Sequence, residues 1–247
     1  TVVDPEGYVV AQMSGEGHAH ALDALIAELV AEHEAAGTLH RGDGPYVAPP
    51  PRDDLLSFPG KVLVLPDGTL LVSDTAHHSL AHLAADGDTL IRRIGSGARG
   101  LVDGPAETAQ FSEPNGLLLL PSDVAAQVGY DVVVADTVNH AIRGVVLAPG
   151  EVRTIAGTGA QWMQVEPTSG AAHEVALSSP WDVAWFDDGV VIAMAGVHRL
   201  DRLDLTTGEV RAYAGTTNEG LVDGELPHAW FAQTSGLATS ADGSTLW

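Results

Sequence analysis

The chain has 247 residues, with 33 acidic and 11 Lys or Arg side chains, and its formal net charge is −22. Such an acidic surface repels phosphate backbones and anionic lipid headgroups, so we expect neither nucleic acid nor a membrane as a partner. There is no cysteine, which excludes a disulfide, a thiolate metal site or a redox pair within the chain itself. Hydrophobic residues make up 45%, enough for a buried core. We expect a cytoplasmic protein.

Residues 1–37 differ in kind from the rest of the chain. Two β-branched runs, at 1–3 and 8–13, flank a turn sequence and predict an antiparallel hairpin. A helix with one apolar stripe follows, and Gly37 is its expected stop. A hairpin and one helix cannot form a domain alone, so their apolar faces need partner elements that this sequence lacks. The stripe consists of Leu22, Leu25, Ile26, Leu29 and Val30.

Residues 38–57 are expected to be a linker, because Gly and Pro are concentrated there. The triplet Pro49-Pro50-Pro51 predicts an extended, semi-rigid stretch.

From Phe58 onward the chain repeats. Three repeats open with Pro59, Pro114 and Pro180, and each continues into apolar strands such as 70–74, 132–136 and 190–194. A fourth repeat begins at Thr234. The second repeat shows four short strands, at 117–120, 132–135, 142–147 and 152–156. Four antiparallel strands per repeat, at blade-sized intervals, predict a β-propeller rather than a helical solenoid.

A second signature recurs in alternate repeats. Gly-Leu-Val-Asp-Gly occurs at 100–104 and again at 220–224, and Phe111 recurs as Phe231 at the same distance downstream. Asp103 and Asp223, which lie inside these segments, are expected to stabilise the loops by accepting hydrogen bonds from backbone amides.

The repeats resemble the NHL repeat. The resemblance rests on the strings Val-Ser-Asp74-Thr-Ala-His-His78 and Val-Ala-Asp136-Thr-Val-Asn139-His140, and on the Pro-x-Gly opening. Residues 1–33 resemble the last two strands and final helix of a thioredoxin-like domain. The order is similar to NHL-repeat-containing thioredoxin-like proteins, which implies a six-bladed propeller, of which about three and a half blades are here. Both chain ends read as interrupted strands, so we expect a fragment, with any redox motif upstream of Thr1.

Asp74 and Asp136 close equivalent strands, so a structural role is favoured: a short carboxylate at a strand end accepts hydrogen bonds from the following turn. The alternative is that these side chains line a central channel and bind a cation such as calcium. Met194 occupies the equivalent position in the third repeat, which interrupts any ring of carboxylates.

His78, His140 and His198 also occupy equivalent positions. Three imidazoles could bind zinc or another divalent metal only if they converged on the inner rim of the channel. A hydrogen bond from each ring to a backbone carbonyl in a turn is the favoured interpretation. Asn115 and Trp181 follow the opening prolines and predict either packing between blades or a ligand pocket. Lys61, the only lysine, is attributed to composition.

No Ser-His-Asp order and no paired carboxylates in a fitting context are found, so no catalytic residue is proposed. The leading hypothesis is a binding or scaffold module that presents a propeller face to a protein or small-molecule ligand, joined in the intact protein to a domain with thiol-disulfide activity. One alternative is a metal-dependent propeller enzyme of the lactonase or amidating-lyase type. Another is a purely structural interaction domain without redox chemistry.

Overall fold

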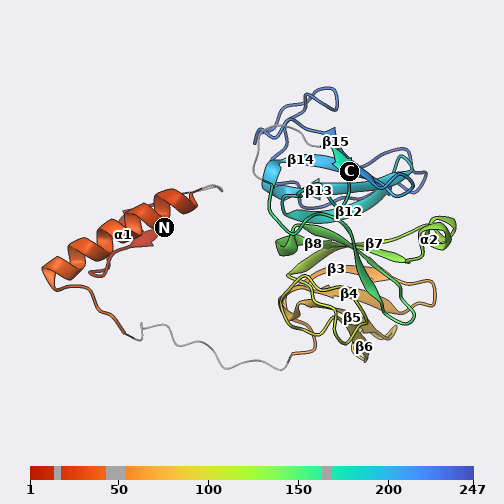
Figure 1. Cartoon of the computed structure of the whole chain (residues 1–247), viewed down its shortest axis with the longest axis horizontal. Coiled ribbons are helices and arrows are strands. Elements are labelled where there is room, and N and C mark those ends of the chain that lie inside the picture. Colours follow the sequence, from red (N-terminus) through yellow and green to blue (C-terminus); the bar gives the residue numbers. More distant parts are fainter. Residues whose placement is uncertain (14–17, 43–53, 163–168) are drawn as a thin grey trace. The chain divides into compact units, whose positions relative to one another are not determined.

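The computed structural model describes residues 1–13, 18–42, 54–162 and 169–247. It separates into an N-terminal unit, Thr1–Asp53, and a propeller unit, Asp54–Trp247 (Figure 1). Each unit is described by itself. The proline triplet of the expected linker lies outside the described residues.

The N-terminal unit is the predicted hairpin and helix. Strands β1 (Val2–Val3) and β2 (Val9–Ala11) pair antiparallel, and the Asp4 carboxylate holds their turn by accepting the Glu6 and Tyr8 amides. Helix α1 (Ala19–Ala36) ends at Gly37, whose φ of 72° is the left-handed cap that glycine adopts at little cost. The stripe of α1 is at best half-buried, so apolar surface is left uncovered among the described residues of this unit.

In its described residues the propeller unit has three antiparallel sheets, each built on four strands in chain order. The first blade consists of β3 (Pro59–Val64), β4 (Leu70–Asp74), β5 (Ser79–Leu83) and β6 (Leu90–Ile94). The second consists of β7 (Pro114–Leu119), β8 (Val132–Asp136), β9 (Ala141–Val145) and β10 (Val152–Ala156). The third consists of β12 (Pro180–Phe186), β13 (Gly189–Met194), β14 (Arg199–Asp204) and β15 (Glu209–Ala214). A short strand, β11 (Gly170–Ala171), adds to the edge of β15.

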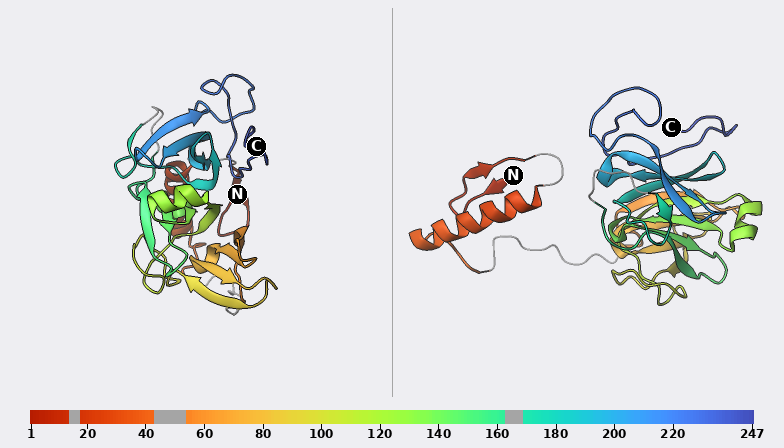
Figure 2. Two further views of the ribbon diagram at one scale, coloured as in Figure 1. Left: turned by 90° about the vertical axis from the view of Figure 1, so that its right-hand side faces the viewer. Right: turned by 45° about the horizontal axis from the view of Figure 1, so that its top comes forward.

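The first strand of each blade is the innermost. β7 contacts both β3 and β12, so the three sheets meet along their first strands. The views in Figure 2 show the same order of blades. The predicted fold class, a β-propeller with four-stranded blades, is confirmed. The start of a fourth blade is also present, as a β-bridge between Thr239 and Leu246.

The core lies between the blades and follows the two-residue period of the strands. On β8, Val132 and Val134 pack toward the first blade, while Val133 and Ala135 pack toward the third. All four side chains are fully buried. A central strand buried on both faces reads as a continuous apolar run, which is the pattern seen in the sequence.

The sequence did not predict helix α2 (Ser122–Val128), which lies in the connection between β7 and β8. It follows Pro121, carries Asp123 in its first turn and ends at Gly129 with a φ of 78°. This helix lies outside the repeat, so comparing repeats does not reveal it.

No helix in the described part of the chain is both long enough and apolar enough to cross a membrane.

Candidate functional site

The three aligned histidines join successive blades. His78, His140 and His198 adopt the left-handed conformation, with φ between 48° and 53°, which histidine tolerates better than most residues. Each ring accepts a backbone N–H from the residue just before the next repeat opens, whereas the sequence predicted a hydrogen bond to a backbone carbonyl. The Nδ1 to N distances are 3.3 Å to Glu113, 3.0 Å to Ser179 and 3.1 Å to Gln233.

This geometry fixes the protonation of the histidines. An Nδ1 that accepts a hydrogen bond carries no proton, so each ring is neutral with its proton on Nε2. Burial lowers the pKa of His140, which favours the same neutral form. The structure thus places each imidazole against the backbone at the start of the next blade.

Asp74 and Asp136 hold the start of their own blade. The buried Asp136 carboxylate accepts the Ser112 amide at 2.7 Å, Asn139 Nδ2 at 2.8 Å and Arg143 Nη1 at 2.7 Å. Burial raises the pKa of Asp136 to about 6, although the charge of Arg143 and these hydrogen bonds act in the opposite direction.

Asp74 has the same arrangement in the first blade. Its carboxylate accepts the Ser57 amide at 2.6 Å and lies 2.7 Å from His77 Nδ1 and 2.5 Å from Arg93 Nη1. All of these partners are groups of the propeller itself.

The third blade keeps a buried ion pair but builds it from other positions. Met194, equivalent to Asp136, is fully buried and apolar. Asp201, equivalent to Arg143, pairs with Arg199 through contacts of 2.6 Å and 3.0 Å. The Arg199 guanidinium also lies over the Trp162 ring, 4.4 Å from its centroid. Burial raises the pKa of Asp201, and its hydrogen bonds with Arg199 oppose that shift.

The repeated loop signature contributes through Asp103. Its carboxylate accepts the Thr154 amide and hydroxyl and Arg143 Nη2, and thereby holds the loop against β10. Desolvation acts to raise the pKa of Asp103, but these hydrogen bonds outweigh it and the pKa is lowered. Asp223, in the second copy of the signature, is exposed.

The metal-ligand candidates are not gathered into one site. Among the residues that the structure describes, no group of three or more His, Cys, Asp or Glu side chains could hold a metal ion. Pro59, Pro114 and Pro180 begin β3, β7 and β12, and each pairs with the last residue of the next strand: Asp74, Asp136 and Met194 respectively.

A different set of residues surrounds a hollow of ≈ 260 Å³ at the inner strands, which we call the axial hollow. Its lining comes from the two positions after the opening residue of each repeat. The first three repeats contribute both positions, and the fourth contributes one. The lining residues are Gly60, Lys61, Asn115, Gly116, Trp181, Asp182 and Ser235.

An ion pair spans this hollow from the first blade to the third. Lys61 Nζ lies 2.6 Å and 2.7 Å from the two oxygens of Asp182. The carboxylate is further held by the Val183 amide and by the Leu237 amide of the fourth repeat, each at 2.8 Å. Asp182 therefore connects three of the four repeats.

Glycine makes this approach possible. A Cβ on Gly116 would lie 2.5 Å from the Asp182 Cα, closer than any real contact, and one on Gly60 would lie 2.8 Å from Asn115 Oδ1. The inner strands can therefore approach closely only without side chains at these positions.

The remaining lining combines an aromatic surface with a hydrogen-bond donor. Trp181 is 42% exposed. The Lys61 ammonium has three N–H donors, and Asp182 takes two of them. Because the two charges cancel, the hollow suits an uncharged polar group next to a flat apolar one.

Sequence reasoning identified Asn115 and Trp181 but missed Lys61 and Asp182. A signal was present: Lys61, Gly116 and Asp182 each lie two residues after an opening proline. Aligning that position across the repeats shows opposite charges separated by a glycine. The single lysine of the chain occupies one of these positions.

Comparisons with known proteins agree with the repeat pattern. No model of a known protein family matches the chain. It is 31% identical over 98% of its length to "Protein SUPPRESSOR OF QUENCHING 1, chloroplastic" of Arabidopsis thaliana, and it covers 23% of that protein. It is 32% identical, again over 98% of its length, to NHL repeat-containing protein 2 of Gallus gallus, covering 35% of it. The chain thus spans about a quarter to a third of these relatives.

Among solved structures, a protein of unknown function from Bacteroides thetaiotaomicron matches 72% of this chain with a TM-score of 0.51. The match covers 42% of that protein, and the sequence identity is 16%. This similarity concerns the fold alone.

Proposed function

Because this chain is a run of NHL-repeat propeller blades, we propose that it is a binding module that presents the axial hollow to a ligand. One observation supports this proposal above the others. Three successive repeats contribute the same two positions to a single concave surface, a fourth contributes one of them, and those positions carry Trp181, Lys61 and Asp182.

The chemistry of the lining suggests what binds there. The Trp181 ring provides an apolar face, and the free donor of Lys61 suits a carbonyl or hydroxyl oxygen. A hollow of ≈ 260 Å³ is at the small end of ligand sites, so it fits a small polar molecule or one side chain of a partner protein.

A fragment screen tests this proposal. The whole chain is titrated with a library of small aromatic amides and alcohols, and binding is followed by NMR. We expect saturable shifts at Lys61, Asn115 and Asp182 that disappear in Trp181→Ala. Trp230→Ala removes a comparably exposed tryptophan elsewhere and should leave binding intact. Fragments that bind only away from the hollow, or equally well to Trp181→Ala, would exclude it as the binding site.

The intact protein is a separate part of the proposal. The resemblance of residues 1–33 to the end of a thioredoxin-like domain supports a propeller that positions partners for an attached thiol-disulfide domain. The test is disulfide reduction by the intact gene product, with each upstream cysteine replaced by serine in turn. We expect reduction that depends on a cysteine pair. An upstream sequence without such a pair ends this part of the proposal and leaves the axial hollow unaffected.

A further inference from the structure

One end of the blades carries a run of acidic turns. The axial hollow marks where the innermost strands begin, so the turns after those strands lie at the opposite end of the sheets. We call that end the hairpin face and define it by six turns: 65–69, 84–89, 120–131, 146–151, 187–188 and 205–208. None of these turns contains Lys, Arg or His. Their acidic residues are Asp67, Asp86, Asp88, Asp123, Asp131, Glu151, Asp187 and Asp188.

Two carboxylates of this face have a lowered pKa. Hydrogen bonds from Thr69 lower the pKa of Asp67, and hydrogen bonds from Thr89 lower that of Asp86.

Three arginines near these turns donate hydrogen bonds to backbone carbonyls of the turns. Arg92 donates to the carbonyls of Leu147 and Pro149, Arg153 to that of Gly129, and Arg202 to that of Asp187. The acidic character of the face is therefore only partly offset.

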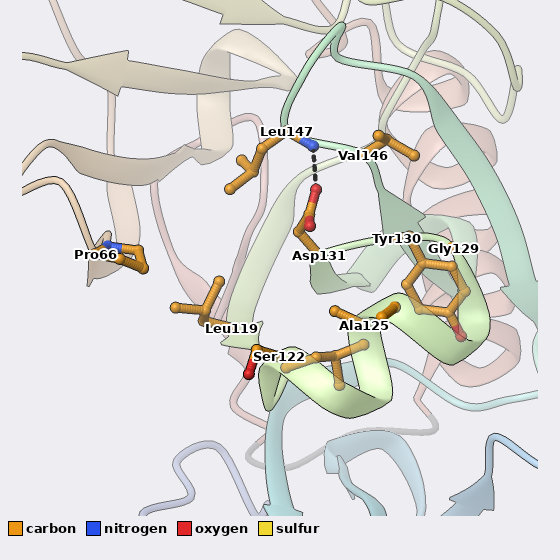
Figure 3. Close-up of a pocket in the computed structure, with 11 residues that line it drawn as sticks. Pro66, Leu119, Ser122, Ala125, Gly129, Tyr130, Asp131, Val146 and Leu147 are labelled. Atoms are coloured by element: carbon orange, nitrogen blue, oxygen red, sulfur yellow. Dashed lines mark hydrogen bonds between the residues drawn. The ribbon is translucent and has the colours of Figure 1, made fainter.

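An apolar pocket opens on the same face, beside helix α2 (Figure 3). Its volume is ≈ 500 Å³. It is lined by side chains from the β3–β4 turn, from α2 and its flanks and from the β9–β10 turn. The lining includes Pro66, Leu119, Ala126, Tyr130, Asp131 and Leu147.

Asp131 brings a carboxylate into this apolar lining. One oxygen accepts the Leu147 amide at 2.7 Å, which fixes the orientation of the side chain, as Figure 3 shows. Within the described part of the chain, the second oxygen has no hydrogen bond. A carboxylate held in this way favours a ligand that places a cationic N–H donor beside an apolar group.

We propose that the hairpin face docks a basic segment of a partner protein, with an apolar side chain of that segment in the α2 pocket and a neighbouring Lys or Arg at Asp131. Charge complementarity identifies the occupant, because an acidic surface attracts and orients a basic one. A second copy of this chain is a poor fit, since it would bring another net charge of −22 to the same surface. The proposal does not depend on the axial hollow.

Selection of random displayed peptides on the whole chain tests this inference. Peptides are kept if they bind the unchanged chain and fail to bind Ala126→Trp, which fills the pocket from the exposed side of α2. Gln127→Trp is the matched control, because it adds the same ring one residue away on an exposed position outside the lining.

We expect the selected peptides to share an apolar residue next to Lys or Arg and to bind less tightly as salt is added. Asp131→Asn should weaken them about tenfold, as expected for loss of one charge-assisted hydrogen bond. Trp181→Ala should not affect them, which separates this site from the axial hollow. Selected peptides without Lys or Arg, an equal loss in Gln127→Trp, or no peptide that prefers the unchanged chain would each overturn the proposal.

Discussion

At the scale of single residues, the same polar positions hold the blades in register. A histidine in the left-handed conformation ties each blade to the start of the next, while in the first two blades an aspartate ties the blade to its own start. Both groups accept hydrogen bonds from backbone amides, and the Ser112 amide that Asp136 accepts is buried. Leaving such a donor unsatisfied costs about 1–3 kcal/mol, so the polar side chains stabilise the apolar packing around them.

His140 should make the stability of the propeller depend on pH. Burial lowers its pKa in the folded state, so the unfolded chain takes up a proton first as the pH falls. Its contribution is therefore present above the unfolded pKa of about 6.5 and is lost as the pH falls from there toward the lowered folded value. We expect His140→Asn to cost about 1 kcal/mol near neutral pH and much less near about pH 5, as measured by urea unfolding.

His173→Asn provides the control, because that histidine is exposed. It should change the free energy of unfolding little at either pH. A difference between His140→Asn and the unchanged chain that stays constant with pH would contradict the neutral-acceptor role.

Arg143 is expected to be the most sensitive charged residue. It is fully buried and bridges Asp136, Asp103 and the backbone carbonyls of Gln110 and Val102. Arg143→Leu leaves Asp136 buried with a charge and no cationic partner, so we expect a loss of about 3–5 kcal/mol in urea unfolding. Arg211→Leu, on the exposed side of β15, should change stability by less than about 0.5 kcal/mol. Equal losses of stability in Arg143→Leu and Arg211→Leu would show that the buried ion pair of Arg143 and Asp136 does not stabilise the blade.

The residue positions could be read from the repeats, but their partners could not. Asp74, Asp136 and the three histidines align in the sequence, and a structural role was favoured there. That each histidine reaches the following blade depends on its left-handed backbone and on the curvature of the arc. Local sequence encodes neither. The third blade's exchange of Asp136 and Arg143 for Met194 and Asp201 likewise becomes clear only when strand register is known.

At the scale of elements, the innermost strands set how tightly the blades pack. β7 lies between β3 and β12, and Gly60 of β3 and Gly116 of β7 leave room for close approach of the neighbouring strand. The strands were predictable from apolar runs and turn residues. Helix α2 was not, because it is an insertion with no counterpart in the other repeats.

Gly116→Ala tests this close approach. The added Cβ would lie 2.5 Å from the Asp182 Cα, and because that atom is backbone, β7 or β12 must move. We expect a loss of about 1–3 kcal/mol in urea unfolding, the usual range for overpacking. Gly236→Ala is the matched control, since it occupies the equivalent place in the fourth repeat and its Cβ would meet nothing within 4 Å. If Gly116→Ala left the free energy of unfolding unchanged, β7 and β12 would have to lie further apart than in this structure.

At the scale of the whole molecule, the propeller unit is an arc with two distinct ends. One end holds the axial hollow, which four repeats build together, and the other carries the acidic hairpin face. The repeats predicted the blades, and the strongly negative charge predicted an acidic surface. Neither predicted that residues of the first and third blades would meet, because that contact depends on three blades packing around one axis.

The contact between Lys61 and Asp182 allows a direct test of that arrangement. A water-soluble carbodiimide joins an amine to a carboxylate in contact with it, and Lys61 is the only lysine of the chain, so its cross-linked peptide is identified without ambiguity by mass spectrometry. If the three blades pack around one axis, the reagent forms an amide bond between Lys61 and Asp182, and this bond is absent from Asp182→Asn. A Lys61 cross-link to a carboxylate outside the third blade, with none to Asp182, would contradict that packing.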